Sequence, residues 1–230
     1  LEQKGGKLVR VVEKSKIPPG NLANAGIYMF TPEIFKWIEK TEKSIRGEYE
    51  ITDTLTMMAA QGNVVCNTYM GEWIDVGRPW DLLRANKLLM GGLKARIDGE
   101  VQPNATIEGN IVLGKGSRIM NGAYIIGPVI IGQDTEIGPN CYIRPSTFIG
   151  NECKVGNASE VKNSILMDRA KAPHHNYVGD SVLGCNTNLG SGTKVANLRL
   201  DDANIKVSLK GKIVDTGLRK LGVITGENVK

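Results

Sequence analysis

The sequence predicts a fold in two parts: an α/β region over residues 1–97 and an all-β parallel β-helix over residues 98–230. The main observation is an aliphatic residue at every sixth position of the second part. A period of six fits neither an α-helix nor the two-residue alternation of an ordinary strand. It fits a chain wound as a triangular prism, with one inward side chain per face and eighteen residues per coil. The aliphatic positions are Val101, Ile107, Leu113, Ile119, Ile125, Ile131, Ile137, Ile143, Ile149, Val155, Val161 and Met167.

The repeat also has interruptions. Glycine follows many of the aliphatic positions and suits the corners, where a positive φ is inexpensive for it. The pattern predicts that the phase is lost around Ala172–His175, at the only two histidines, and returns at Leu183. It resumes again around Leu221–Ile224. A solenoid cut within a coil leaves an open strand edge, so we expect the chain to be a piece of a longer protein, truncated at both ends.

The first part lacks the six-residue period and has the pattern of mixed α/β structure. Leu8–Glu13 and Gly26–Phe30 are expected as strands. A helix is expected over Pro32–Lys43, with Ile34, Phe35 and Ile38 on one face and Thr31-Pro32 at its start. Further helices are expected over Thr52–Ala60 and Pro79–Leu89, the last leading through Gly91-Gly92 into the β-helix.

Composition narrows the classes of function. No run of about 18 apolar residues is present, which argues against a membrane span. The net charge of +5 is modest, and no basic stripe is interleaved with aromatic residues, which argues against nucleic acid and allows an anionic small molecule. Four cysteines without a C-x-x-C pair argue against zinc and indicate reduced thiols in a cytoplasmic protein.

Motifs in the first part carry a resemblance to the C-terminal half of the sugar-1-phosphate nucleotidylyltransferases, whose domain is Rossmann-like. In order, they are Val12-Glu13-Lys14, Asn24-Ala25-Gly26-Ile27-Tyr28, Arg46-Gly47-Glu48-Tyr49-Glu50-Ile51-Thr52-Asp53 and Trp73-Ile74-Asp75-Val76-Gly77. The resemblance implies that Glu13 and Asn24 bind the sugar, that Lys14 binds its phosphate, and that Asp75 is one of two Mg²⁺ ligands. Carboxylates and a cationic donor suit those tasks. The family's G-x-G-T-R-L segment and second carboxylate are absent, so the chain alone is not expected to transfer nucleotidyl groups.

The second part resembles the left-handed β-helix acyltransferases of the hexapeptide-repeat family, which assemble as trimers with active sites between subunits. Its polar motifs are similar to the acetyltransferase domain of the bifunctional glucosamine-1-phosphate acetyltransferase and N-acetylglucosamine-1-phosphate uridylyltransferases, in an archaeal version. They include Arg144-Pro145, Glu160-Val161-Lys162, Ala172-Pro173-His174-His175-Asn176-Tyr177-Val178-Gly179-Asp180, Asn186-Thr187-Asn188-Leu189-Gly190-Ser191-Gly192-Thr193 and Val195-Ala196-Asn197-Leu198.

This resemblance assigns roles position by position. His174 is the expected general base, since imidazole titrates near neutral pH, and His175 occupies a position that is usually apolar. The Ser191 N–H would face the oxyanion, and Asn197 would orient the acetyl group or the base. The expected substrate-binding residues are Arg144 and Lys162 for the sugar phosphate, Tyr177 and Asn188 for the sugar, and Lys206.

The expected function is therefore acetyl transfer from acetyl-CoA to glucosamine 1-phosphate, followed by uridylyl transfer from UTP to the product. One alternative is a monofunctional glucose-1-phosphate nucleotidylyltransferase, using UTP or dTTP, with a structural or regulatory β-helix. Another is a non-enzymatic scaffold resembling eukaryotic translation-factor subunits with the same domain pair. Individual residues also have competing interpretations: Glu13-Lys14, Arg144 and Lys162 as solvated charges, Asp75 as a turn cap and His174 as a loop residue without a task.

Overall fold

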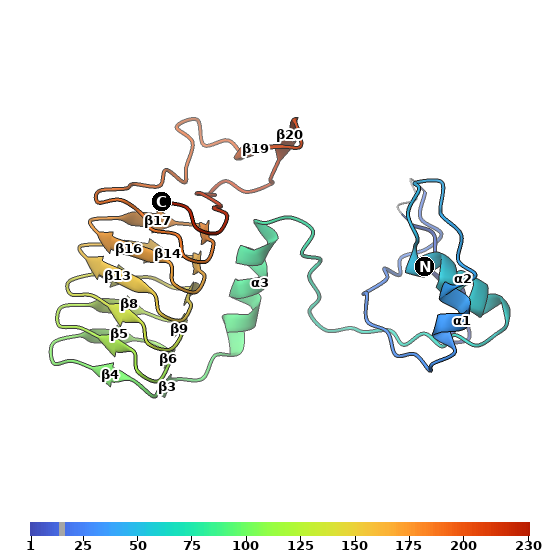
Figure 1. Ribbon diagram of the computed structural model, residues 1–230, viewed down its shortest axis with the longest axis horizontal. Helices are drawn as coiled ribbons and strands as arrows, with labels where there is room; N and C mark the ends of the chain where they lie inside the picture. Colours follow the sequence, from blue (N-terminus) through green and yellow to red (C-terminus); the bar gives the residue numbers. More distant parts are fainter. Residues whose placement is uncertain (14–16) are drawn as a thin grey trace. The chain divides into compact units, whose positions relative to one another are not determined.

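The computed structural model describes residues 1–13 and 17–230, and within them the chain forms two compact units, Leu1–Trp73 and Ile74–Lys230 (Figure 1). Each unit is described by itself. In the described part of the chain, no helix has both the length and the apolar character needed to cross a membrane. The domain division expected from the sequence, 1–97 and 98–230, stays a prediction.

The first unit is a small α/β arrangement. Strands β1 (Glu2–Lys4) and β2 (Lys7–Arg10) form an antiparallel hairpin. Helix α1 spans Ile34–Ile38 and helix α2 spans Ile51–Ala60. Leu8 of β2 packs against Leu55 and Ala59 of α2, which forms the core of this unit.

Two expectations for the first unit are wrong. Gly26–Phe30 is not a strand, because Gly26 has φ +72° and its N–H donates to the Asn24 side chain, which turns the chain there. Helix α1 is shorter than Pro32–Lys43, and its N-cap is Glu33 without a side-chain cap. It ends early because the Lys40 and Thr41 N–H groups bond to carbonyls three residues back, a tight last turn.

The second unit begins with helix α3 (Asp81–Leu89) and the 3₁₀ turn η1 (Met90–Gly92), then winds into a prism of three parallel sheets. Face 1 contains β4 (Glu100–Val101), β7 (Arg118–Ile119), β10 (Glu136–Ile137), β13 (Lys154–Asn157) and β16 (Lys171–His174). Face 2 contains β5 (Thr106–Glu108), β8 (Tyr124–Ile126), β11 (Tyr142–Ile143), β14 (Glu160–Lys162) and β17 (Tyr177–Gly179). Face 3 contains β3 (Arg96–Ile97), β6 (Ile111–Leu113), β9 (Val129–Ile131), β12 (Thr147–Ile149), β15 (Ile165–Leu166) and β18 (Val182–Leu183).

The predicted aliphatic columns form the core of the prism. From Leu113 to Val161 every member of the six-residue series is fully buried, and equivalent residues of successive coils stack in register. The parallel β-helix predicted from the spacing is confirmed. The left-handed sense, which came from the resemblance, stays a prediction.

The phase break lies earlier than the sequence pattern indicates. Leu166 occupies the column position expected for Met167, and Ala172 is fully buried within its column. Ile149 pairs with Leu166, seventeen residues on, where earlier coils have eighteen. The corner between Val161 and Leu166 is one residue shorter than the same corner of the earlier coils, and so is the corner between Val178 and Leu183.

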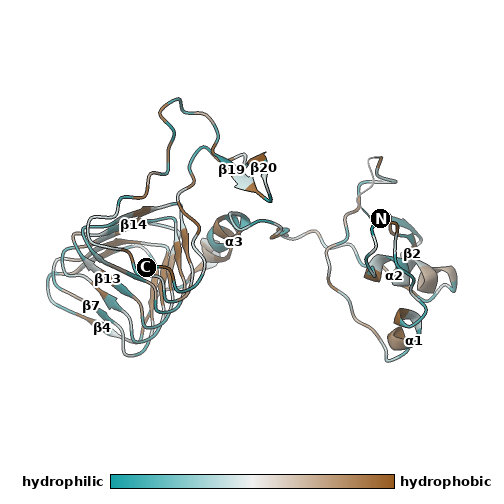
Figure 2. Ribbon diagram, turned by 45° about the horizontal axis from the view of Figure 1, so that its top comes forward, coloured by the Kyte–Doolittle hydropathy of each residue, from teal (hydrophilic) through white to brown (hydrophobic). Residues whose placement is uncertain are grey.

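The last coil is interrupted by an insertion. Residues 198–220 leave the prism, form the hairpin β19 (Lys206–Leu209) and β20 (Lys212–Asp215), and return at Leu221. Ile224 then pairs in parallel with Val182, which confirms the predicted resumption of the repeat. A second apolar cluster lies on the outside of face 3, beside α3 (Figure 2). In this cluster Trp80, which directly precedes α3, and Leu83 of α3 pack with Ile165.

Candidate functional site

The outer surface of face 2 carries a strip of polar side chains in two rows. Within each short strand the middle or last aliphatic residue points inward, so its neighbours point outward. Register places Tyr124, Tyr142, Glu160 and Tyr177 in the first row, and Ile126, Arg144, Lys162 and Gly179 in the second. Three of the residues expected to bind substrate therefore share this strip.

Arg144 is fixed by its neighbours in the strip. Its Nη1 donates to Glu160 Oε1 at 2.9 Å, and its guanidinium lies over the Tyr142 ring, 5.6 Å from the centroid. Tyr142 in turn stacks on Tyr124 with ring centroids 5.4 Å apart. The hydrogen bond to the Glu160 carboxylate raises the pKa of Arg144, so this group remains a cation. Most of its N–H donors remain available to an anion.

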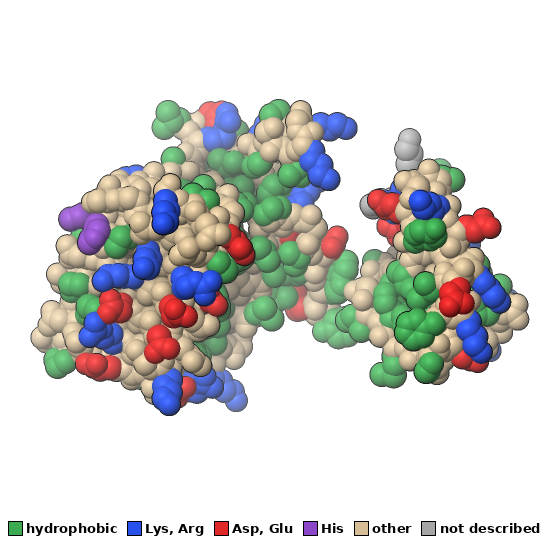
Figure 3. Space-filling view, in the orientation of Figure 1, with side chains coloured by type: hydrophobic (Ala, Val, Ile, Leu, Met, Phe, Trp, Pro, Cys, Tyr) green, Lys and Arg blue, Asp and Glu red, His purple; other side chains and the backbone are tan. Residues whose placement is uncertain are grey.

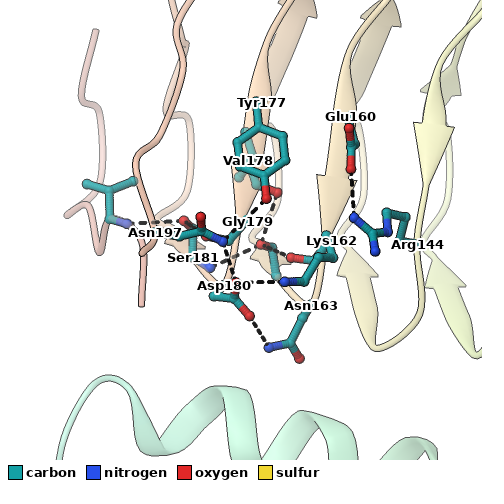
Figure 4. A network of polar contacts seen from close by, with 12 residues as sticks. Arg144, Glu160, Lys162, Asn163, Tyr177, Val178, Gly179, Asp180, Ser181 and Asn197 are labelled. Carbon is teal, nitrogen blue, oxygen red and sulfur yellow. Dashed lines mark hydrogen bonds and ion pairs between the residues drawn. The ribbon is translucent and has the colours of Figure 1, made fainter. Parts of the chain in front are cut away.

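A buried carboxylate organises the second row at the corner between faces 2 and 3 (Figure 4). Asp180 is only 4% exposed and accepts from the Lys162 ammonium at 3.0 Å. Its Oδ1 accepts from Asn163 Nδ2 at 2.7 Å, and its Oδ2 accepts from Asn197 Nδ2 at 2.5 Å. Side chains from the coil before and the coil after thus converge on one carboxylate.

The corner where they meet is the one shortened by one residue. Lys162 and Asn163 belong to its first shortened passage, and Asp180 belongs to the second. On the third passage the insertion leaves after Asn197, and Leu221 returns with its N–H on the Asn197 carbonyl at 3.1 Å. The departure from the repeat therefore coincides with the polar network, and not with the histidines as the sequence suggested.

Tyr177 lies along the strand and reaches this network. Its Oη is 3.3 Å from Asn197 Nδ2. A Cβ built on Gly179 would lie 2.7 Å from Tyr177 Oη and 2.6 Å from Asn197 Nδ2. Only a glycine at position 179 leaves room for the phenol to lie there.

The histidines occupy the preceding corner, between faces 1 and 2. His174 ends β16 beside Asn157, and His175 follows with φ +51°; both are exposed (Figure 3). The Gly192 N–H donates to the His174 carbonyl at 3.0 Å, which stacks the Ser191 turn on the His174 turn. His174 and Ser191 therefore share one corner, and His174 lies three residues before Tyr177 along the chain.

Two predicted substrate residues lie elsewhere. Asn188 is on the face 1 side, where it bridges in parallel to Lys171. Lys206 lies on the inserted hairpin, opposite Asp215. The sequence reasoning did not single out Asp180, although a count of residues per coil would have drawn attention to its corner.

The residues expected to serve nucleotidyl transfer lie outside the prism. Glu13 is exposed, 4.0 Å from Arg46, and Lys14 lies outside the described residues. Asn24 donates to Tyr28 Oη at 2.5 Å and accepts from the Gly26 N–H. Asp75 is an exposed carboxylate. No group of three or more potential ligands among His, Cys, Asp and Glu gathers in the described ranges 1–13 and 17–230.

The four cysteines, all within the described ranges, are unpaired. Cys141 and Cys153 point into the prism, and burial raises the pKa of the two thiols to about 12 and about 11. These thiols stay protonated near neutral pH and serve as packing groups.

Comparison with known proteins matches both parts of the chain. Residues 2–91 match the nucleotidyl transferase family, and residues 125–230 match the GMPPB C-terminal domain. The bifunctional protein GlmU of Methanocaldococcus jannaschii is 45% identical over 97% of this chain and 54% of its own length. A bifunctional sugar-1-phosphate nucleotidylyltransferase/acetyltransferase of Sulfurisphaera tokodaii is 43% identical over 97% of this chain and 56% of its own.

A third relative, the bifunctional protein GlmU of Methanococcus maripaludis strain C7, is 49% identical over 97% of this chain and 55% of its own length. Among solved structures, PerB from Caulobacter crescentus, in complex with CoA and GDP-perosamine, aligns with a TM-score of 0.42 and 16% identity, covering 53% of this chain and 57% of that one. The chain spans about half the length of the curated relatives it matches. Over nearly its whole length, then, the chain is similar to about half of each of these proteins, which are named as bifunctional.

Proposed function

We propose that the chain forms part of a cytoplasmic bifunctional enzyme of nucleotide-sugar synthesis. Its β-helix transfers the acetyl group of acetyl-CoA to glucosamine 1-phosphate, and the whole protein then couples the N-acetylated product to UTP. The observation that supports the acetyl transfer is the strip on face 2 with Arg144, Lys162 and Tyr177, flanked by Asn197 at one corner and His174 at the other. Below, "full-length protein" means the polypeptide of the relatives' length that carries this chain.

The strip has the chemistry of a sugar-phosphate site. Arg144 donates a hydrogen bond to Glu160, and Lys162 donates one to Asp180. Both side chains have further N–H groups that can bind a phosphate dianion. The Tyr177 hydroxyl can donate to a sugar oxygen. A phosphate bound near the two cations would place the sugar along the face, toward the corner that carries His174.

The acetyl transfer then follows from ordinary acyl chemistry. The amine nitrogen attacks the thioester carbonyl while His174 takes one of its protons, and a tetrahedral oxyanion forms. The Ser191 N–H stabilises that oxyanion. Collapse breaks the carbon–sulfur bond, releases the coenzyme A thiolate and leaves the amide. We assign Asn188 and Lys206 to substrate or coenzyme binding from a neighbouring copy, since they lie off face 2.

Trimeric assembly belongs to the same proposal. Face 2 exposes charged and aromatic side chains that a second prism would cover in part, forming a cleft with the strip on one wall. Light scattering of the full-length protein is expected to give three times the mass of one chain. A monomer that transfers acetyl groups at full rate would contradict this assembly.

For nucleotidyl transfer, we assign Glu13, Lys14 and Asn24 to the sugar phosphate and Asp75 to Mg²⁺. An exposed carboxylate is the donor that Mg²⁺ takes, usually with water and phosphate oxygens as other ligands. Bound there, the ion would offset the charge of the reacting phosphates. Asp75 supplies one ligand and the rest of the full-length protein the other. Whether UTP or dTTP is the nucleotide depends on the base-binding segment.

The two histidines offer the sharpest experiment. His174→Ala in the full-length protein is expected to lower acetyl transfer by roughly 10²–10⁴-fold, and His175→Ala is expected to change it little. Greater damage from His175→Ala would move the base by one position. Nucleotidyl transfer without any acetyl transfer in wild type would favour a structural β-helix instead.

A further inference from the structure

The orientation of the Asn197 amide is decided by its partner. An ionised carboxylate only accepts hydrogen bonds, so only the Nδ2 end of Asn197 can face Asp180, at 2.5 Å. The second amide hydrogen points at Tyr177 Oη, 3.3 Å away. Both donors of the Asn197 side chain are therefore engaged within the protein.

The amide oxygen is left for a ligand. Among the described residues, none donates a hydrogen bond to Asn197 Oδ1. Without Asp180 the amide could present either end, since its nitrogen and oxygen are almost identical in shape. With Asp180 in place, the end of the amide that has no hydrogen-bond partner among the described residues is the acceptor oxygen.

We propose that Asp180 is a positioning residue that fixes Asn197 as an acceptor for the substrate amine. This inference rests on the proposed acetyl transfer. An acceptor matches the N–H of the amino group and holds the amine with its lone pair free to attack. It does not match the acetyl carbonyl, which needs a donor. Asn197 therefore holds the amine and leaves the acetyl oxygen to the Ser191 N–H.

The same carboxylate holds the phosphate end of the strip. Lys162 Nζ lies 3.0 Å from Asp180 Oδ2, and its side chain is 18% exposed. Because Asp180 itself is almost fully buried, it stays in place whether or not substrate is bound. The Asp180 carboxylate thereby positions two substrate-binding groups, the Asn197 amide and the Lys162 ammonium. Displacing the amide should lower kcat, and displacing the lysine should raise KM.

The test uses Asp180→Asn in the full-length protein, a change of nearly constant shape. An asparagine can turn its own NH₂ toward Asn197, which lets that amide flip. We expect kcat for acetyl transfer to fall on the order of 10- to 100-fold, since misplacement of a reacting group costs that much. Nucleotidyl transfer should remain unchanged.

A double-mutant cycle separates positioning from mere stability. If Asp180 acts through Asn197, adding Asp180→Asn to Asn197→Ala should lower kcat by less than about 3-fold, while the KM increase through Lys162 persists. Full additivity in kcat would overturn the proposal. The matched control is Asn163→Gly, which removes a different hydrogen bond to Asp180, at a position with φ +44° that glycine adopts readily. A kcat loss equal to that of Asp180→Asn would also overturn it.

One readout does not depend on turnover. In [¹⁵N]asparagine-labelled protein, the Asn197 side-chain NH₂ should exchange slowly with water, and this protection should disappear in Asp180→Asn. A wild-type protein that shows the protection but transfers no acetyl group would overturn the proposed function and leave the Asp180–Asn197 geometry standing. Equal exchange in both proteins would overturn the positioning role itself.

Discussion

Adding one methyl group at Gly179 is expected to disable acetyl transfer without unfolding the protein. The new Cβ would lie 2.6 Å from Asn197 Nδ2 and 2.7 Å from Tyr177 Oη. To reach an ordinary contact of 3.4 Å, Asn197 must move by about 0.8 Å and Tyr177 by about 0.7 Å. Such a shift also disturbs the 2.5 Å hydrogen bond between Asn197 and Asp180.

The size of the effect follows from that displacement. A misplacement of about 1 Å costs roughly 10²-fold in rate, so kcat for Gly179→Ala should fall by about that factor. Stability should change by less than about 1 kcal/mol, because the groups displaced are side-chain ends and the backbone of Gly179 is not in the left-handed region.

The assay is release of the coenzyme A thiol, together with a thermal melt of the same sample. Gly226→Ala is the matched control, since a Cβ there meets no atom within 4 Å. Gly179→Ala with acetyl transfer within 3-fold of wild type would refute the reasoning, because the positions of Tyr177 and Asn197 would then not matter. A large drop in melting temperature would show that the methyl group strains the coil and not the site.

Three further outcomes are expected. Asp75→Asn in the full-length protein should abolish nucleotidyl transfer and leave acetyl transfer nearly intact, and an equal loss of both would mean that Asp75 is structural. Ile137→Ala should cost about 2–5 kcal/mol of unfolding free energy in denaturant titrations, because the side chain is fully buried, whereas Ile97→Ala, at a half-exposed position, should cost much less. Burial raises the pKa of Cys141 from 9.0 to about 12, so the folded protein should resist alkylation of this thiol at pH 8. The thiol ionises in the unfolded chain first, so its contribution to stability is complete below pH 9 and is lost as the pH rises toward 12; Cys141→Ala should weaken that alkaline dependence.

The sequence was sufficient to predict the prism because its columns depend only on aliphatic side chains at fixed spacing. The sequence pattern misplaced the phase break because Leu166 and Met167 are adjacent and both apolar. The six-residue spacing therefore still met an apolar residue at Met167, although Leu166 is the residue in the column. In the first unit, Gly26–Phe30 has the composition of a strand, but its chain turns at Gly26. The pattern of apolar residues does not reveal this turn, because the hydrogen bond that forms it is accepted by the side chain of Asn24.

For the site, the resemblance supplied Arg144, Lys162, Tyr177 and Asn197. The structure places the first three on one strip and Asn197 at the corner beside it, within 3.3 Å of Tyr177 Oη. The resemblance did not supply Asp180, whose importance depends on three partners in the coils before and after it. Each partner lies seventeen or eighteen positions from Asp180 in the chain. Only the coil length, which sequence spacing misjudged here, makes them neighbours.

The inserted segment 198–220 has its two ends on adjacent backbone positions, joined by the hydrogen bond from Leu221 to Asn197. Its length can therefore change without breaking the coil. Its sequence is less free, because Ile205, Val207, Val214 and Leu218 pack against the apolar cluster outside face 3. The inserted segment also begins one residue after Asn197, whose amide we assign to the substrate amine. Because the segment leaves the prism directly after Asn197, a change in its length alters the surroundings of this amide while the buried aliphatic columns stay the same.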